Sequence, residues 1–217
     1  MIFIAVALGL LYGFLVRKGN WQSVTRKHFR LLALLILSVM VEVVLVTPLL
    51  GRWLDTGSIS APLRTFLAIA QYGMLLVFLG VNSKKPGVLA VMAGTCLNGL
   101  VIIFNDGRMP VGQAVSRFGP TAAEKIASAP GYFLAAGQEP LLFLGDILPF
   151  WTLGWYMISV GDLLIALGLF FLAAYMPRRI LRPRPARKSH AVVQSNDIRY
   201  TEGRNKNRSE MPKKNRK

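Results

Sequence analysis

The sequence predicts an all-α fold, a polytopic transmembrane bundle of about five helices. Three observations predict this class: the 217 residues are 53% hydrophobic, their mean hydropathy is +0.44, and long apolar runs recur along the chain. The runs hold roughly 16 to 20 residues, about the length that a helix needs to cross some 30 Å of hydrocarbon. A helix also satisfies its own backbone hydrogen bonds in lipid, whereas an open strand does not.

Five apolar runs are the predicted spans, and they cover residues 2–16, 31–50, 65–81, 88–104 and 155–176. We expect the first run to be an uncleaved helix, because no basic residue precedes it and no cleavage site of the small-x-small type is evident. Residues 105–154 are also apolar, but prolines recur through them. They are therefore expected to form short interfacial or re-entrant pieces in a long outer loop, within a transmembrane domain of residues 1–176.

The distribution of basic residues predicts the orientation. Residues 17–30, 84–85 and 178–217 hold 21 of the 26 Lys and Arg. The positive-inside rule places these segments in the cytoplasm and the N-terminus outside the cell membrane. The tail, 177–217, is basic and poor in apolar residues, so we expect it to be disordered and to touch anionic lipid headgroups. No folded module or aromatic interleaving favours binding of nucleic acid.

Few residues suit metal or redox chemistry. Cys96 is the single cysteine, and His28 and His190 are the only histidines, so no internal disulfide, zinc site or haem site is expected. We expect no cofactor. The sequence also lacks the zinc-protease, nucleotide-binding and nucleophile-elbow motifs, which weakens the case for an enzyme.

Polar side chains recur within the apolar runs. Asp162 precedes Arg178 by a helical rise of about 24 Å, which places it near the outer surface, beside an aromatic belt of Trp151, Trp155 and Tyr156. An ionised acid facing lipid costs several kcal/mol, so these groups are expected to face a polar cavity that opens outward. The candidate ligand-binding residues are Glu42, Asn98, Asn105, Arg108, Asp146, Ser159 and Asp162.

Structural roles compete with this interpretation. Ser38, Gln71, Asn98 and Ser159 are typical of interhelical hydrogen bonds, which we favour for these four residues. For the carboxylates at positions 42 and 162 we favour a functional site. An ion pair with Arg64 or Arg108 would instead be architectural. For Asp146 and Asp162 together, with Arg108 nearby, an Arg–Asp clamp and a ligand site remain equally open.

Three segments resemble a family known as domain of unknown function 5317: "NDGRMPV" (Asn105–Val111), "FLGDILP" (Phe143–Pro149) and "SVGDLLIALG" (Ser159–Gly168). The resemblance covers residues 1–176 and implies a bacterial membrane protein, with no activity attached. Asp106 stands where the pattern has glycine. The structural motif residues are Gly107, Met109, Pro110, Gly145, Pro149, Gly161 and Gly168.

The glycines in these motifs have expected roles. Gly107 permits a positive φ where the fourth span ends, and Pro110 prevents that helix from resuming. Gly145 and Gly161 let a backbone approach the neighbouring acid or a ligand. Gly9 and Gly13 in the first span, with Gly161 and Gly168 in the last, are expected to be helix-packing seams.

Three functions follow from these features. The first is a membrane protein that binds or transports a small molecule, cation or proton at an outward-facing polar site. The second is a non-catalytic scaffold or accessory protein whose polar residues only hold helices together. The third is a membrane enzyme that acts on a lipid or envelope precursor.

Overall fold

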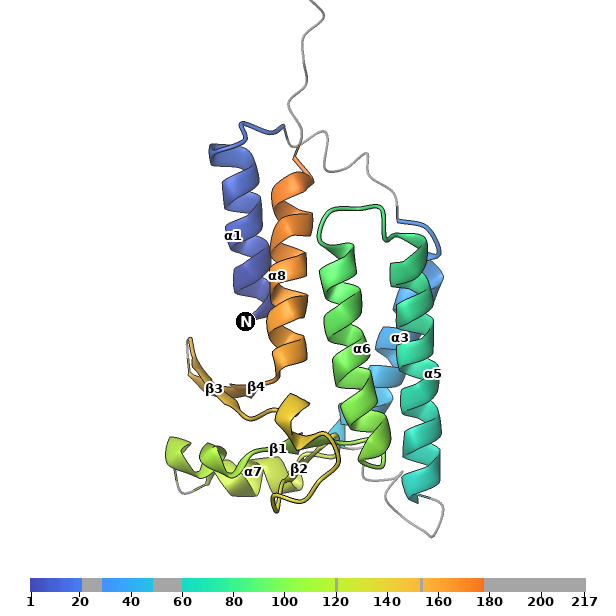
Figure 1. Ribbon diagram of the computed structural model, residues 1–217, viewed down its shortest axis with the longest axis vertical. Helices are drawn as coiled ribbons and strands as arrows, with labels where there is room; N and C mark the ends of the chain where they lie inside the picture. The colour runs from blue at the N-terminus through green and yellow to red at the C-terminus, as the bar shows by residue number, and fades with distance from the viewer. Residues whose placement is uncertain (21–28, 49–59, 120, 153, 178–217) are drawn as a thin grey trace, which may run out of the picture. The chain divides into compact units, whose positions relative to one another are not determined.

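The computed structural model describes residues 1–20, 29–48, 60–119, 121–152 and 154–177 (Figure 1). Helices predominate in these ranges. Except for Pro177, the predicted tail lies outside the described residues, as do Arg26, Lys27 and Arg52.

Five apolar helices form the main body: α1 (Ile2–Leu15), α3 (Leu32–Val46), α5 (Ser60–Val81), α6 (Val88–Phe104) and α8 (Val160–Tyr175). They pack in a series, because α1 contacts α8, α8 contacts α6, α6 contacts α5, and α5 contacts α3. A small core between α5 and α6 holds Phe78, Leu79, Val88 and Val91.

The helices match the predicted runs with some differences. α6 has the predicted bounds, and α5 begins five residues earlier than predicted. α3 ends at Val46, because Thr47 is extended, as a residue that precedes a proline tends to be. Of the described helices, only α5 is long and apolar enough to cross a membrane by length and composition. α1, α3, α6 and α8 are apolar but have 14 to 17 residues.

The prediction that one helix covers 155–176 is wrong at its start. Trp155–Ile158 form strand β4, which pairs antiparallel with β3 (Leu148–Trp151). Aromatic residues favour strands, and Ser159 begins the helix only after them, with a capping box formed with Asp162. The fold is therefore mostly helical, with short strands, and not all-α.

The segment between α6 and β3 folds into short elements. They are β1 (Met109–Val111), the 3₁₀ helix η1 (Gln113–Phe118), α7 (Ala122–Ser128), β2 (Tyr132–Leu134) and the 3₁₀ helix η2 (Leu142–Leu144). β1 and β2 pair in parallel, with Met109 opposite Tyr132. None of the described elements in this segment is a helix of spanning length (Figure 1).

Contacts between the helices show that α3, α5, α6 and α8 alternate in direction along the series, whereas α1 runs parallel to α8. At one end, Asn82 in the α5–α6 turn accepts a hydrogen bond from the Arg30 backbone N–H, and Arg17 Nη1 donates to Ala174 O at the end of α8. At the other end, Arg64 Nη1 donates to Leu45 O. Gly107 packs against Arg64, and its φ of 75° agrees with the predicted left-handed turn.

Glycines permit the closest helix contacts. A Cβ at Gly9 would lie 2.9 Å from Ala173 Cβ, and one at Gly13 would lie 2.9 Å from Ala174 O. α1 therefore packs closely on α8 along the predicted seam. Gly168 lies against the start of α6, where an added Cβ would be 2.7 Å from Val91 N.

Candidate functional site

A cavity of about 280 Å³, here called the inner cavity, lies among α1, α3, α5, α6, α8 and the outer segment. Its lining includes the carboxylates of Glu42, Asp146 and Asp162, which come from three separate parts of the chain. No Lys or Arg is among its lining residues in the described part of the chain. The remaining polar lining consists of two amides and two tyrosines, Gln71, Asn98, Tyr72 and Tyr132.

On one side of the inner cavity, α3 and α5 are joined by a hydrogen bond. Gln71 Nε2 donates to Glu42 Oε2, so the carboxylate near the middle of α3 is held by a neutral amide. Ser38, one helical turn before Glu42, is buried. The amide partner leaves the negative charge of Glu42 uncompensated at this contact.

On the opposite side, α6 and α8 are joined by a hydrogen-bond network. Asn98 Nδ2 donates to Asp162 Oδ1 at 2.9 Å, and Ser159 Oγ donates to Asn98 Oδ1 at 2.8 Å. Asp162 N donates to Ser159 Oγ at 2.9 Å, and Ser159 N donates to Asp162 Oδ2 at 3.2 Å. A carboxylate here also faces the positive end of the helix dipole, so Asp162 stabilises the start of α8.

A glycine makes this network possible. A Cβ at Gly161 would lie 2.7 Å from Gly94 O and 2.7 Å from Asn98 Cγ. Only a residue without a side chain lets α8 approach α6 so closely. This agrees with the expected role of Gly161 in the third motif.

The first two motifs contact each other directly. Asp146 N donates to Pro110 O at 3.0 Å, and Gly112 N donates to Asp146 O at 2.9 Å. Val111 and Asp146 therefore form a parallel β-bridge beside β1. Gly145 allows this approach, because a Cβ there would lie 2.8 Å from Pro110 O. The backbone of Pro110 and Gly112 thus holds the backbone of Asp146 in place.

The Asp146 side chain is buried, and one of its oxygens has no partner. The residue is 8% exposed, and Oδ1 accepts no hydrogen bond within the described part of the chain. Burial, followed by the negative charge of Asp162, raises the pKa of Asp146 to about 8. An arginine partner would lower this pKa, and no arginine is among the causes of its shift.

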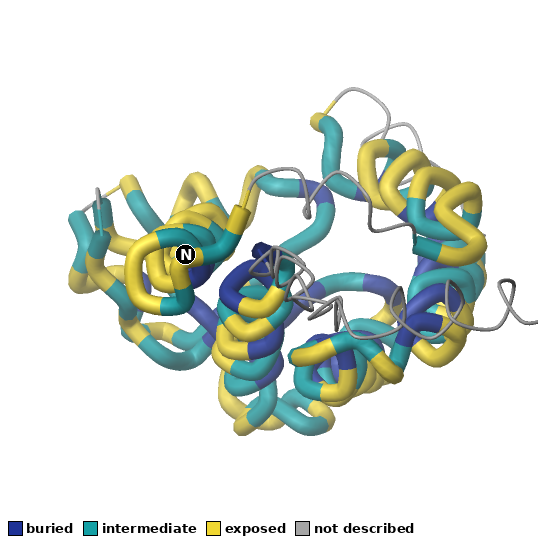
Figure 2. Tube along the Cα trace, turned by 90° about the horizontal axis from the view of Figure 1, so that it is seen from above, coloured by how far each residue is buried: buried dark blue, intermediate teal, exposed yellow. Residues whose placement is uncertain are grey.

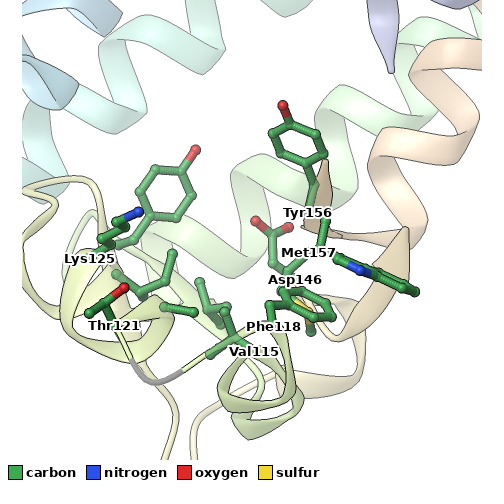
Figure 3. Close-up of a pocket in the computed structure, with 12 residues that line it drawn as sticks. Val115, Phe118, Thr121, Lys125, Asp146, Tyr156 and Met157 are labelled. Atoms are coloured by element: carbon green, nitrogen blue, oxygen red, sulfur yellow. The ribbon is translucent and has the colours of Figure 1, made fainter. Parts of the chain in front are cut away.

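A second cavity, here called the outer cavity, adjoins the same acid and has a volume of about 410 Å³ (Figure 3). Asp146 and Tyr132 line both cavities. Burial, with a further contribution from the charge of Asp146, raises the pKa of Tyr132 to about 12, so this phenol stays neutral near pH 7. Trp155 and Tyr156, two members of the predicted aromatic belt, also line the outer cavity, and the belt itself stays a prediction.

The predicted ligand-binding residues do not all meet at one site. Glu42, Asn98, Asp146 and Asp162 line the inner cavity, and Ser159 is buried behind them. Asn105 and Arg108 line a different cavity of about 640 Å³, with Arg64 and Glu139. There Asn105 Nδ2 donates to Val101 O and Pro140 O, and so joins the end of α6 to the outer segment.

Sequence reasoning missed two polar residues of the inner cavity, Tyr72 and Tyr132. Tyr72 follows Gln71, but one helix position turns its side chain by about 100°, so the polar spacing on α5 did not identify it. Tyr132 lies in a short strand whose pairing with β1 depends on contacts distant in sequence. Among the described residues, no three His, Cys, Asp or Glu side chains form a group that could hold a metal ion.

Comparison with known proteins places the chain in a family. A model of a family of unknown function, DUF5317, matches residues 26–174, which is more than half of the chain. The chain therefore belongs to this family, as the three motifs indicated. It is also 29% identical over 132 residues to an uncharacterized protein of Thermotoga maritima, an alignment that covers 59% of this chain and 74% of the relative. No solved structure matches the chain significantly.

Proposed function

We propose that this chain is a multi-pass membrane protein whose five apolar helices cross the bilayer, with the N-terminus outside and the tail in the cytoplasm. Large apolar side chains along these helices are exposed, including Phe3 (89%), Met40 (61%), Phe66 (65%) and Phe104 (61%). Figure 2 shows exposed positions, in yellow, along the helices. Soluble proteins rarely expose apolar surface on this scale, whereas lipid covers it without cost.

The lengths of the helices are compatible with this proposal. Helices of 14 to 17 residues are about 21 to 26 Å long, and the 22 residues of α5 give about 33 Å. A bilayer adjusts to a short span by local thinning, at a fraction of a kcal/mol per Å of mismatch.

We further propose that the inner cavity binds a cation or a proton from the outer side. One observation carries this proposal: three carboxylates from separate segments line one cavity that has no basic residue in its described lining. These three acids do not form a group that could ligate one metal ion together. Their like charges still repel in a site of low dielectric, so a proton, or a cation that keeps part of its water shell, stabilises them. The unpartnered oxygen of Asp146 supplies an acceptor for such a ligand.

Cation binding by the purified full-length chain in detergent tests this proposal. Isothermal titration calorimetry at pH 8.5 with K⁺, Na⁺ and Mg²⁺ would measure affinity, because more than half of Asp146 is ionised at that pH. We expect Glu42→Gln and Asp146→Asn each to weaken binding about tenfold or more. The matched control is Asp106→Asn. Asp106 is an exposed acid outside the inner cavity, so this variant should bind the cation with the affinity of the native chain. Absence of binding, or equal loss in the control, would overturn the proposal.

A scaffold role has one specific observation in its favour, the closed network of Asn98, Ser159 and Asp162. Its members largely satisfy one another and tie α6 to α8. The variant Asp162→Asn separates the two functions. A large drop in thermal stability with unchanged cation affinity assigns this acid to the scaffold, while lost affinity at unchanged stability assigns it to the binding site.

A further inference from the structure

The outer cavity differs from the inner one in its lining. Four aromatic residues face it, Phe118, Tyr132, Trp155 and Tyr156, together with Asp146 and Lys125. Phe118 and Trp155 stack with their ring centroids 5.1 Å apart. A volume of about 410 Å³ falls within the range of roughly 300 to 1,000 Å³ that is typical of small-molecule sites.

Aromatic rings beside a carboxylate are the chemistry that recognises an organic ammonium ion. The ring faces attract a cation, and the rings also bury the apolar substituents of the ligand, which a hydrated metal ion lacks. Asp146 supplies the opposite charge, and its buried Oδ1 has no partner in the described chain. Figure 3 shows its carboxylate beside Tyr156, with Lys125 and Thr121 across the cavity.

We propose that the outer cavity binds the ammonium group of an organic amine, with the charge on Asp146 and the substituents against the aromatic rings. This inference is linked to the proposed function because Asp146 and Tyr132 line both cavities. The aromatic residues Phe118, Trp155 and Tyr156 line the outer cavity and not the inner one. The ligand chemistry is the ammonium group, whether it belongs to a soluble amine or to a lipid headgroup. Lys125 opposes a singly charged amine, because like charges repel across the cavity.

Calorimetry on the full-length chain at pH 8.5 tests the inference with benzyltrimethylammonium, whose charge does not depend on pH. The comparison ligands are K⁺ and the neutral benzyl alcohol. We expect Trp155→Leu and Tyr156→Leu each to weaken the binding of benzyltrimethylammonium about tenfold. Neither variant should change the affinity for K⁺. Trp155→Phe, which keeps a ring, should retain most of the affinity, and Lys125→Gln should raise it severalfold.

The matched control is Trp151→Leu. Trp151 lies opposite Trp155 in the same hairpin, is 65% exposed and does not line the outer cavity, so its loss should leave binding unchanged. Thermal unfolding of each variant would show that the hairpin is intact. The inference is overturned if this control loses as much affinity as Trp155→Leu, or if benzyl alcohol binds as tightly as the charged ligand.

The two proposals can fail separately. If Glu42→Gln abolishes amine binding while Trp155→Leu has no effect, the inner cavity binds the amine and the outer-cavity inference fails. If no K⁺ binds but the amine depends on Trp155, the inference stands and the inner-cavity proposal fails. If a lipid with an ammonium headgroup competes with benzyltrimethylammonium, the natural ligand is a lipid. If this lipid does not compete, the natural ligand is a soluble amine.

Discussion

The side chain of Asp146 is kept from water by the outer segment, and this burial sets the pH at which it becomes charged. A carboxyl group with a pKa of about 8 is mostly protonated at neutral pH. An incoming cation must then displace a proton, so binding at the inner cavity would release a proton to the medium.

The stability of the chain should depend on pH through this residue. Its pKa is raised on folding from 3.8 to about 8, so its stabilising contribution is full below about pH 3.8, falls as pH rises, and is absent above about pH 8. The native chain should lose up to about 1 kcal/mol per pH unit within this window, whereas Asp146→Asn should lose less. Thermal unfolding in detergent between pH 5 and 9 measures the stability of the native chain and of Asp146→Asn. If the two chains show the same dependence of stability on pH, the raised pKa of Asp146 is contradicted.

Asp162 explains why an acid stands within an apolar sequence. The residue is not in the middle of a helix but in the first turn of α8, where it completes a capping box and accepts from Asn98. A helix start has unpaired N–H donors, and a carboxylate satisfies one of them. This role coexists with its place in the wall of the inner cavity.

At the scale of elements, the contact between α1 and α8 depends on small residues. Gly9 and Gly13 face Ala173 and Ala174 across the seam. None of the cavity carboxylates takes part in this seam, so it offers a test of helix packing that changes no charged group of the candidate site.

The same substitution should have opposite effects at two glycines. Gly9→Ala places a Cβ 2.9 Å from Ala173 Cβ and should destabilise the chain by about 1–3 kcal/mol through overpacking. Gly73→Ala in α5 meets nothing within 4 Å and should stabilise it by about 0.5–1 kcal/mol through helix propensity. Thermal unfolding of the two variants measures these effects. If both substitutions change the stability in the same direction, the close packing of α1 on α8 at Gly9 is contradicted.

At the scale of the whole molecule, charge is asymmetric along the proposed membrane normal. The end with Arg17, Arg30 and Lys85 carries no described acidic residue. The described acids outside the cavity, Asp106, Glu124 and Glu139, belong to the opposite end. The positive-inside rule counts Lys and Arg, and the opposite end also carries Arg64, Arg108, Arg117 and Lys125, so the orientation stays a prediction.

Cysteine labelling in intact cells tests the orientation. In a Cys96→Ser background, Lys125→Cys should react with a membrane-impermeant maleimide, because the proposed topology has α7 outside. Lys84→Cys, an exposed residue of the α5–α6 turn, should react only after lysis. The reverse pattern would invert the topology, and labelling of both in intact cells would exclude a membrane between them.

The sequence alone determined the positions of the apolar helices, because a long apolar run has few ways to satisfy its backbone except a helix. It also identified the family motifs and the acids Glu42, Asp146 and Asp162. The tertiary structure decided which of these meet. Asp146 reaches the inner cavity through hydrogen bonds to Pro110 and Gly112, and Trp155 lines the outer one because its strand pairs with β3. Such contacts join residues far apart in sequence, and helical periodicity carries no information about them.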